Sequence, residues 1–240
     1  MKRYFEYEFS DEIREKLIAF YDEESFMHEK DIQERGMKIK LERALKYVQL
    51  NCNDLVCDVG CSRGTLLNMV ADRVSYGLGL DIAKGFIEEN NRLNEHSNIA
   101  YRNFDGIELP TEKLFDKIFL FDVLEHSFEP DNLIKSIYLH LKNRGELIII
   151  VPGSGWLSEL LFGKYHMGHL RYYDKKYLCD YLQKFNFSIK ASEIYNSVPY
   201  NSILTKWPKI YTILDKLCNI IPHRLYPYFG SILVVATREE

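Results

Sequence analysis

The sequence predicts an α/β protein in which a mainly parallel sheet carries helices on both faces. From Leu55 onward, short apolar runs alternate with stretches of helical spacing, which is the order that parallel strands with crossover helices require. Two of these runs, 115–121 and 146–151, are almost continuously apolar toward their ends, as strands buried on both faces are.

Residues 1–50 are expected to form a helical cap without a strand, because they are charged and their apolar residues recur every three to four positions. Residues 51–240 are expected to form one domain, with a helical insertion at 196–230 before the last strand. Its predicted strands are 55–59, 76–80, 99–104, 115–121, 146–151, 188–195 and 231–237. Its predicted helices are 65–73, 83–95, 131–141 and 175–185, and 153–173 is expected to be a loop.

Composition narrows the class of protein. A chain of 240 residues with 46% apolar and 28% charged residues can bury a large core without disulfides or metals. The net charge of −4 without a long basic run argues against nucleic acid as a partner. Five cysteines without a CxxC pair suit a reducing compartment. No run approaches the ~18 apolar residues of a membrane span, so we expect a cytoplasmic protein.

The most informative segment is a glycine-containing turn at 58–65, between a predicted strand and a predicted helix. Such a turn brings backbone N–H groups and a helix N-terminus to the sheet edge where ligands bind. A dinucleotide fingerprint would need a glycine where Ser62 stands. A G-x-S-x-G nucleophile elbow fits the letters, but the charged residues 1–54 do not supply the strands that precede it. An acid two residues before Gly60 suits a cationic ligand that has no pyrophosphate.

This turn reads Asp58-Val59-Gly60-Cys61-Ser62-Arg63-Gly64, which resembles the first motif of class I S-adenosylmethionine-dependent methyltransferases, (D/E)-x-G-x-G-x-G. Asp81 lies 21 residues after Gly60, near the ~20 expected for an acid that binds ribose hydroxyls. The segments 102–106, 115–126 (with its VLEH run) and 141–152 resemble later motifs of the family in the same order. The match spans about 40–195 and is closest in character to ubiquinone-biosynthesis-type O-methyltransferases.

The resemblance implies a Rossmann-like sheet of about seven strands with the last antiparallel, and S-adenosyl-L-methionine as cofactor. Asp58 would bind the methionine ammonium directly or through water, Asp81 the ribose diol, and Asp105 the adenine amino group. Asp58 and Asp81 could instead only cap the turn or the following helix, and Asp105-Gly106 is also a plain turn signal. The other expected cofactor contacts are Gly60, Cys61, Ser62, Gly64, Ile82, Phe104, Phe121 and Asp122.

The resemblance places the acceptor beside the loop that follows the fifth strand. His169 is the expected general base, because an imidazole pKa lies near working pH; a structural histidine is the alternative. Asp122-x-x-Glu125-His126 resembles a metal-binding run of the ubiquinone O-methyltransferases. Because VLEH also occurs in methyltransferases without metal, we expect none.

The expected reaction moves a methyl group from the sulfonium to a small-molecule acceptor, with oxygen as the expected atom. Quinone precursors, sugars and lipid-linked glycans are the candidate acceptors. An NAD-type oxidoreductase and a non-catalytic S-adenosylmethionine-binding protein stay open as alternatives. The aromatic and mildly basic insertion 196–230 allows an acceptor lid, a dimer surface or peripheral membrane contact, and its prolines exclude a span.

Overall fold

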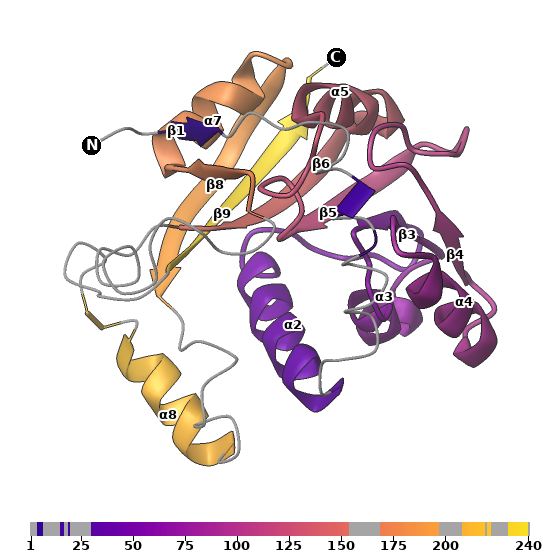
Figure 1. The fold of residues 1–240 in the computed structure, drawn as a ribbon, viewed down its shortest axis with the longest axis horizontal. Helices are drawn as coiled ribbons and strands as arrows, with labels where there is room; N and C mark the ends of the chain where they lie inside the picture. Colours follow the sequence, from indigo (N-terminus) through magenta and orange to yellow (C-terminus); the bar gives the residue numbers. More distant parts are fainter. Residues whose placement is uncertain are drawn as a thin grey trace.

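A seven-stranded sheet with the order β4-β3-β2-β5-β6-β9-β8 runs through the computed structural model (Figure 1). The model describes residues 4–6, 15–16, 19, 30–153, 169–196, 208–218, 220–221 and 230–239. The strands of the sheet are β2 (Leu55–Val59), β3 (Tyr76–Asp81), β4 (Ile99–Asn103), β5 (Phe115–Phe121), β6 (Leu141–Pro152), β8 (Phe187–Asn196) and β9 (Gly230–Arg238). The first five strands in the order are parallel, and β9 is antiparallel to both of its neighbours. The predicted sheet and its antiparallel last strand are confirmed.

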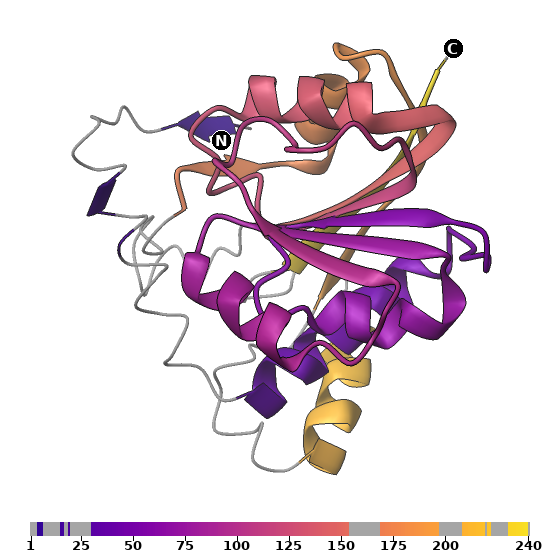
Figure 2. The same cartoon turned by 90° about the vertical axis from the view of Figure 1, so that its right-hand side faces the viewer.

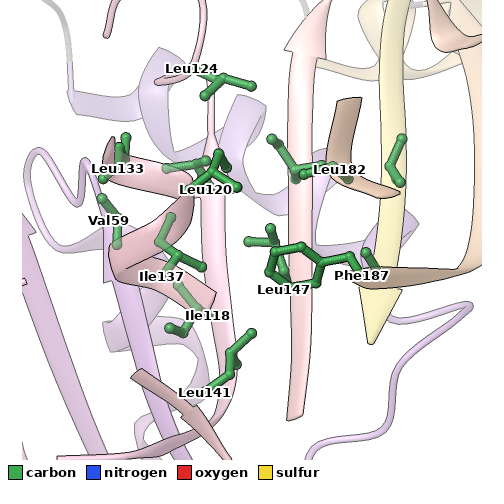
Figure 3. Close-up of a cluster of buried hydrophobic side chains, with 14 of the residues drawn as sticks. Val59, Ile118, Leu120, Leu124, Leu133, Ile137, Leu141, Leu147, Leu182 and Phe187 are labelled. Atoms are coloured by element: carbon green, nitrogen blue, oxygen red, sulfur yellow. The ribbon is translucent and has the colours of Figure 1, made fainter. Parts of the chain in front are cut away.

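Helices cover both faces of the sheet (Figure 2). The described helices are α2 (Lys30–Ala44), α3 (Thr65–Val70) with the 3-10 turn η1 (Ala71–Arg73), α4 (Lys84–Leu93), α5 (Pro130–His140), α7 (Lys175–Gln183) and α8 (Pro208–Cys218). Side chains of α5 and α7 form one buried core with the sheet, which Figure 3 shows around Leu133 and Leu182. Side chains of α2, α3 and α4 form a second core on the opposite face. The doubly wound architecture is therefore confirmed.

The central strand β5 stabilises the sheet by burying side chains on both of its faces. Its residues 117–121 are buried, and Ile118 and Phe119 face the two opposite cores. Each such side chain contributes about 1.5–3 kcal/mol by burial. Lys117 is tolerated among them because its Nζ lies 2.9 Å from an Asp54 carboxylate oxygen and 3.7 Å from one of Glu146.

Two sequence predictions were wrong at the N-terminus and in the loop after β6. Strand β1 (Tyr4–Glu6) pairs antiparallel with β7 (Arg171–Tyr173), although 1–50 was expected to hold no strand and 153–173 to be a loop. Three residues carry too little alternation to reveal a strand, because such a pairing depends on contacts between distant segments. Strand β6 also begins at Leu141 and has a register shift opposite Phe115 and Lys117, so residues 142–145, which were expected to separate the helix 131–141 from the strand 146–151, lie inside an irregular strand.

The helical cap and the insertion are described only in part. Helix α2 occupies the end of the cap, and α8 lies within the insertion. Much of the rest of both segments, and all of 154–168, lies outside the described residues. The domain boundaries therefore stay predictions. Among the described helices, none combines the length and the apolar character needed to cross a bilayer.

Candidate active site

A cavity of about 260 Å³ opens where the parallel strands end. Because β4, β3, β2 and β5 are parallel neighbours, the residues that follow them meet at one edge of the sheet. The lining comes from the ends of these strands and from the helices that follow: Gly60, Ser62, Asp81, Ile82, Phe86, Phe104, Gly106, Asp122, Val123, His126, Ser127, Phe128 and Leu133.

The glycine turn, residues 60–64, forms one wall of the cavity. Gly60 adopts a left-handed backbone with a φ of 79°, and a Cβ atom there would clash with Cγ2 of Val123. The N–H groups of Gly60 and Cys61 donate to the carbonyl of Leu80, at 2.7 and 2.9 Å. The turn is therefore fixed against β3, and glycine is needed at position 60 both for its dihedral and for the space.

Asp81 is the carboxylate that connects the turn to the cavity. Its Oδ2 accepts from the Ser62 N–H at 2.8 Å, and its Oδ1 accepts from the Ala83 N–H at 2.9 Å. Asp81 thus has the structural role that the sequence left open, and it also lines the cavity. A carboxylate has about four lone-pair sites, so a residue of this type can accept more hydrogen bonds than these two.

Asp58 lies below the turn in β2 and is not among the lining residues. It is 1% exposed, and its Oδ2 has no hydrogen-bond partner among the described residues. Burial, and to a smaller extent the negative charge of Asp81, raises the pKa of Asp58 to about 8. A cation bound nearby would favour the ionised form.

The raised pKa of Asp58 predicts that stability depends on pH. The folded pKa of about 8 exceeds the unfolded value of about 3.9, so the folded protein binds more protons between these values. The contribution of Asp58 to the free energy of unfolding is therefore lost as pH rises from about 4 to 8, by as much as about 1.4 kcal/mol per pH unit. Urea unfolding of the ligand-free Asp58→Asn variant should show a gain over wild type that grows from pH 5 to pH 8. Parallel pH profiles would contradict the assignment.

Helix α2 contributes a cation that sequence analysis missed. The Nζ of Lys40 pairs with the carboxylate of Asp122, which lines the cavity. Asp122 itself has a left-handed φ of 54° at the end of β5. Lys40 belongs to no motif. The sequence signal that could have revealed it is its position near Leu41 and Ala44, which are buried against the sheet. A lysine beside the buried face of a helix lies close to the sheet.

His169 is not among the residues that line the cavity, but it lies against the loop after β5 that contributes His126 to the lining. The N–H groups of Leu170 and Arg171 both donate to the Glu125 carbonyl, at 2.8 and 3.2 Å. The rings of His126 and His169 meet edge to face with centroids 4.7 Å apart, and His126 lines the cavity. The structure thus brings the predicted base next to the cavity.

Glu125 lies buried beside these two histidines. Its Oε1 is 3.7 Å from Nε2 of His126. Burial first, and the nearby Asp122 carboxylate second, raise the pKa of Glu125 well above its usual value. Glu125, His126 and His169 offer one donor atom each within 4.8 Å of one another. The run at 122–126 is therefore split, because Asp122 pairs with Lys40 while the other two residues meet His169.

The structure brings some of the predicted cofactor contacts to the cavity and leaves others away from it. The predicted contacts that line it are Gly60, Ser62, Asp81, Ile82, Phe104 and Asp122. Those that do not line it are Asp58, Cys61, Gly64, Asp105 and Phe121. Asp105 uses its Oδ1 to accept from the N–H groups of Ile107 and Glu108, at 2.8 and 3.1 Å, so it forms the plain turn that its sequence also allowed. The ligand roles of all these residues stay predictions.

The sheet order, the glycine turn and the acid after β3 define a class I S-adenosylmethionine-dependent methyltransferase. The model of the methyltransferase domain family matches residues 27–192, and the chain belongs to this family. The family match supports a methyltransferase and not the alternative of an NAD-type oxidoreductase.

Relatives and solved structures agree with this assignment. A ubiquinone biosynthesis O-methyltransferase of Rickettsia typhi is 26% identical over 80% of this chain and 81% of its own length. A malonyl-(acyl-carrier protein) O-methyltransferase of Marinomonas sp. is 24% identical over 66% of this chain and 62% of its own. A phosphoethanolamine N-methyltransferase 2 of Haemonchus contortus, solved with S-adenosyl-L-methionine, has a TM-score of 0.63 at 19% identity, over 85% of this chain and 53% of its own. At such identity, the structural likeness concerns the fold.

Proposed function

We propose that the chain transfers the methyl group of S-adenosylmethionine to an oxygen atom of a small-molecule acceptor. The observation that carries the proposal is that Asp81 after β3 and Asp122 after β5 line the same cavity. Strand β2 lies between these two strands, so the two carboxylates flank the glycine turn from opposite sides. This arrangement suits a ligand with a ribose at one end and a charged amino acid at the other.

The proposed cofactor extends along the strand ends. Asp81 accepts the ribose hydroxyls, and Ile82 and Phe104 supply apolar surface for adenine. Toward β5, the pair of Asp122 and Lys40 complements the amino acid zwitterion: the carboxylate favours the ammonium and the sulfonium, and the lysine favours the cofactor carboxylate. Asp58 adds a buried counter-charge below the turn.

Replacing Lys40 by methionine should weaken the binding of S-adenosylhomocysteine roughly 2- to 10-fold, because the net contribution of one hydrogen bond is about 0.5–1.5 kcal/mol. Titration calorimetry measures the change. Lys38→Met is the matched control, since Lys38 is exposed on the same helix and should bind as wild type does. Equal affinities for the two variants would exclude Lys40 from the cofactor site.

The proposed reaction needs little chemistry from the protein. The bond between the sulfur and the methyl carbon breaks as the acceptor oxygen forms its bond to that carbon, and S-adenosylhomocysteine leaves. The cavity aligns the two partners and excludes water. His169 takes the acceptor proton on a ring nitrogen. The ring of His126 contacts the ring of His169 and so positions this base beside the cavity.

Two of the relatives act on oxygen according to their names, which supports oxygen as the acceptor atom in this chain. A quinone precursor, a sugar or a lipid-linked glycan is the proposed acceptor class. The N-methyltransferase among the similar structures marks the main alternative, a nitrogen acceptor.

We expect this reaction to run without a metal, although Glu125, His126 and His169 would fit a divalent cation. One carboxylate oxygen and two imidazole nitrogens form a donor set that such ions accept. A bound cation would act as a Lewis acid on the acceptor oxygen. After dialysis against a chelator, unchanged turnover is the expected result. A loss of turnover that manganese or zinc restores would contradict it.

The test of the proposed function combines binding and turnover. S-adenosylhomocysteine should raise the melting temperature of the protein, whereas NAD should not. With S-adenosylmethionine labelled in the methyl group, label should enter a small-molecule fraction of a metabolite extract. The labelled product should be a methyl ether, which resists hydrolysis, or a methyl ester, which hydrolyses. Binding without transfer would favour a non-catalytic protein, and label on nitrogen would refute the oxygen assignment.

A further inference from the structure

Helix α8 carries a cluster of apolar side chains that face solvent. Eight large apolar residues are exposed among the described residues, and five of them lie between 210 and 221. We call these five the α8 surface, and their exposed fractions run from 40% to 76%. They are Ile210, Ile213, Leu217, Ile220 and Ile221. Exposed large apolar residues gathered in one short segment are typical of an interaction site.

The α8 surface follows the geometry of the helix. Ile210, Ile213 and Leu217 are spaced by three and four residues, so they share one face. Leu214 and Cys218 beside them are only partly exposed, and Lys216 is exposed. The helix is therefore amphipathic, with its apolar face open to solvent.

The α8 surface is also fixed to the fold. Asn196, the buried last residue of β8, donates from Nδ2 to the carbonyls of Cys218 and Ile221, both at 2.8 Å. These bonds hold the end of the helix at the carboxyl end of β8. Both views show α8 standing away from the sheet, on the same side as α2 (Figures 1 and 2).

The charge and composition of the surrounding sequence indicate what this surface contacts. The 196–230 segment holds four cationic residues against one aspartate, a net charge of +3 within a chain of −4. It also contains one tryptophan, four tyrosines and one phenylalanine. Aromatic residues concentrate at the interface between membrane and water, and cations are attracted to anionic headgroups. A helix of 11 residues is about 16 Å long, so it can lie in the interface but cannot span the membrane.

We propose that the α8 surface docks the protein on a bilayer that contains anionic lipid. The apolar face enters the boundary between headgroups and acyl chains, and Lys216, which is exposed on the same helix, contacts the headgroups. If the α8 surface bound a second copy of the chain instead, that binding would not depend on anionic lipid. This proposal stands apart from the identity of the methyl acceptor.

The test is co-sedimentation with vesicles, without cofactor or acceptor. The full chain should bind vesicles of phosphatidylcholine and phosphatidylglycerol, bind weakly to phosphatidylcholine alone, and dissociate as salt rises. Leu217→Asp and Ile213→Asp should each weaken binding about tenfold or more, because one buried leucine accounts for such a factor. The matched control is Leu139→Asp on α5, where the leucine is 64% exposed; it should bind as wild type does.

Three outcomes would overturn the proposal. They are no binding to anionic vesicles, equal losses in the α8 variants and the Leu139 control, and a dimer that Leu217→Asp dissociates while vesicle binding is absent. Melting temperatures show that each variant is folded, and the two α8 variants check each other. S-adenosylhomocysteine binding by the same variants should stay unchanged, so failure here is distinguishable from failure of the proposed function.

Discussion

The Asp81→Ala variant is expected to bind S-adenosylhomocysteine roughly 5- to 150-fold more weakly than wild type, which corresponds to about 1–3 kcal/mol. The carboxylate is buried, accepts from the Ser62 and Ala83 N–H groups, and is proposed to accept from the ribose as well. Its removal leaves these donors without an acceptor and loosens the turn from β3. Titration calorimetry gives the dissociation constants, and labelled methyl transfer should fall in parallel.

Two further variants separate the roles of Asp81. Asp81→Asn keeps the shape and one acceptor oxygen, so it should lose less affinity than the alanine variant. Asp180→Ala removes a carboxylate from the exposed surface of α7 and should leave the affinity unchanged. If Asp81→Ala destabilised the ligand-free protein but bound the ligand with the wild-type constant, Asp81 would be only a structural cap.

Replacing Gly60 by alanine should reduce the free energy of unfolding by roughly 2–5 kcal/mol. The left-handed backbone costs a non-glycine residue about 1–2 kcal/mol, and the clash with Val123 adds about 1–3 kcal/mol of overpacking. Urea unfolding measures the loss. Cofactor binding should also weaken, because the residue lines the cavity.

The chain offers a matched control for Gly60. Gly106 has nearly the same φ, 82°, but within the described part of the chain a Cβ there would meet only the Cδ1 of Ile82, at 3.8 Å. Gly106→Ala should therefore show the dihedral cost without the clash. Introducing Val123→Ala into the Gly60→Ala variant should recover the part due to the clash. Equal losses at the two glycines would mean that Val123 does not crowd the turn.

The parallel core of the fold could be predicted from the sequence because its strands are recognisable from their local residue pattern. Runs such as 115–121 and 146–151 are apolar enough to be recognised alone, and the turns between strands and helices contain small residues. The position of Asp81 could also be predicted, because the distance along the chain from a glycine turn to the next strand end is nearly constant in this fold. The structure places it at the cavity.

Other parts depend on contacts that no local pattern encodes. Lys40 and Asp122 are 82 residues apart, and only the packing of α2 on the sheet brings them together. His169 lies beside the cavity residue His126 because the two residues after it bond to the Glu125 carbonyl. The motif gave the positions of Asp58 and Asp105 but not the directions of their side chains, which burial in β2 and a local turn decide.

The place of β9 inside the sheet has a consequence for synthesis on the ribosome. This strand pairs with both β6 and β8, yet it is made after both of them. From the end of β8 at Asn196 to the end of β9 at Arg238 the ribosome adds 42 residues, which takes roughly 2–8 s at about 5–20 residues per second. During that interval one edge of β6 is unpaired and β8, whose partner in the sheet is β9, has no strand beside it, and unpaired strand edges favour aggregation until β9 has been made.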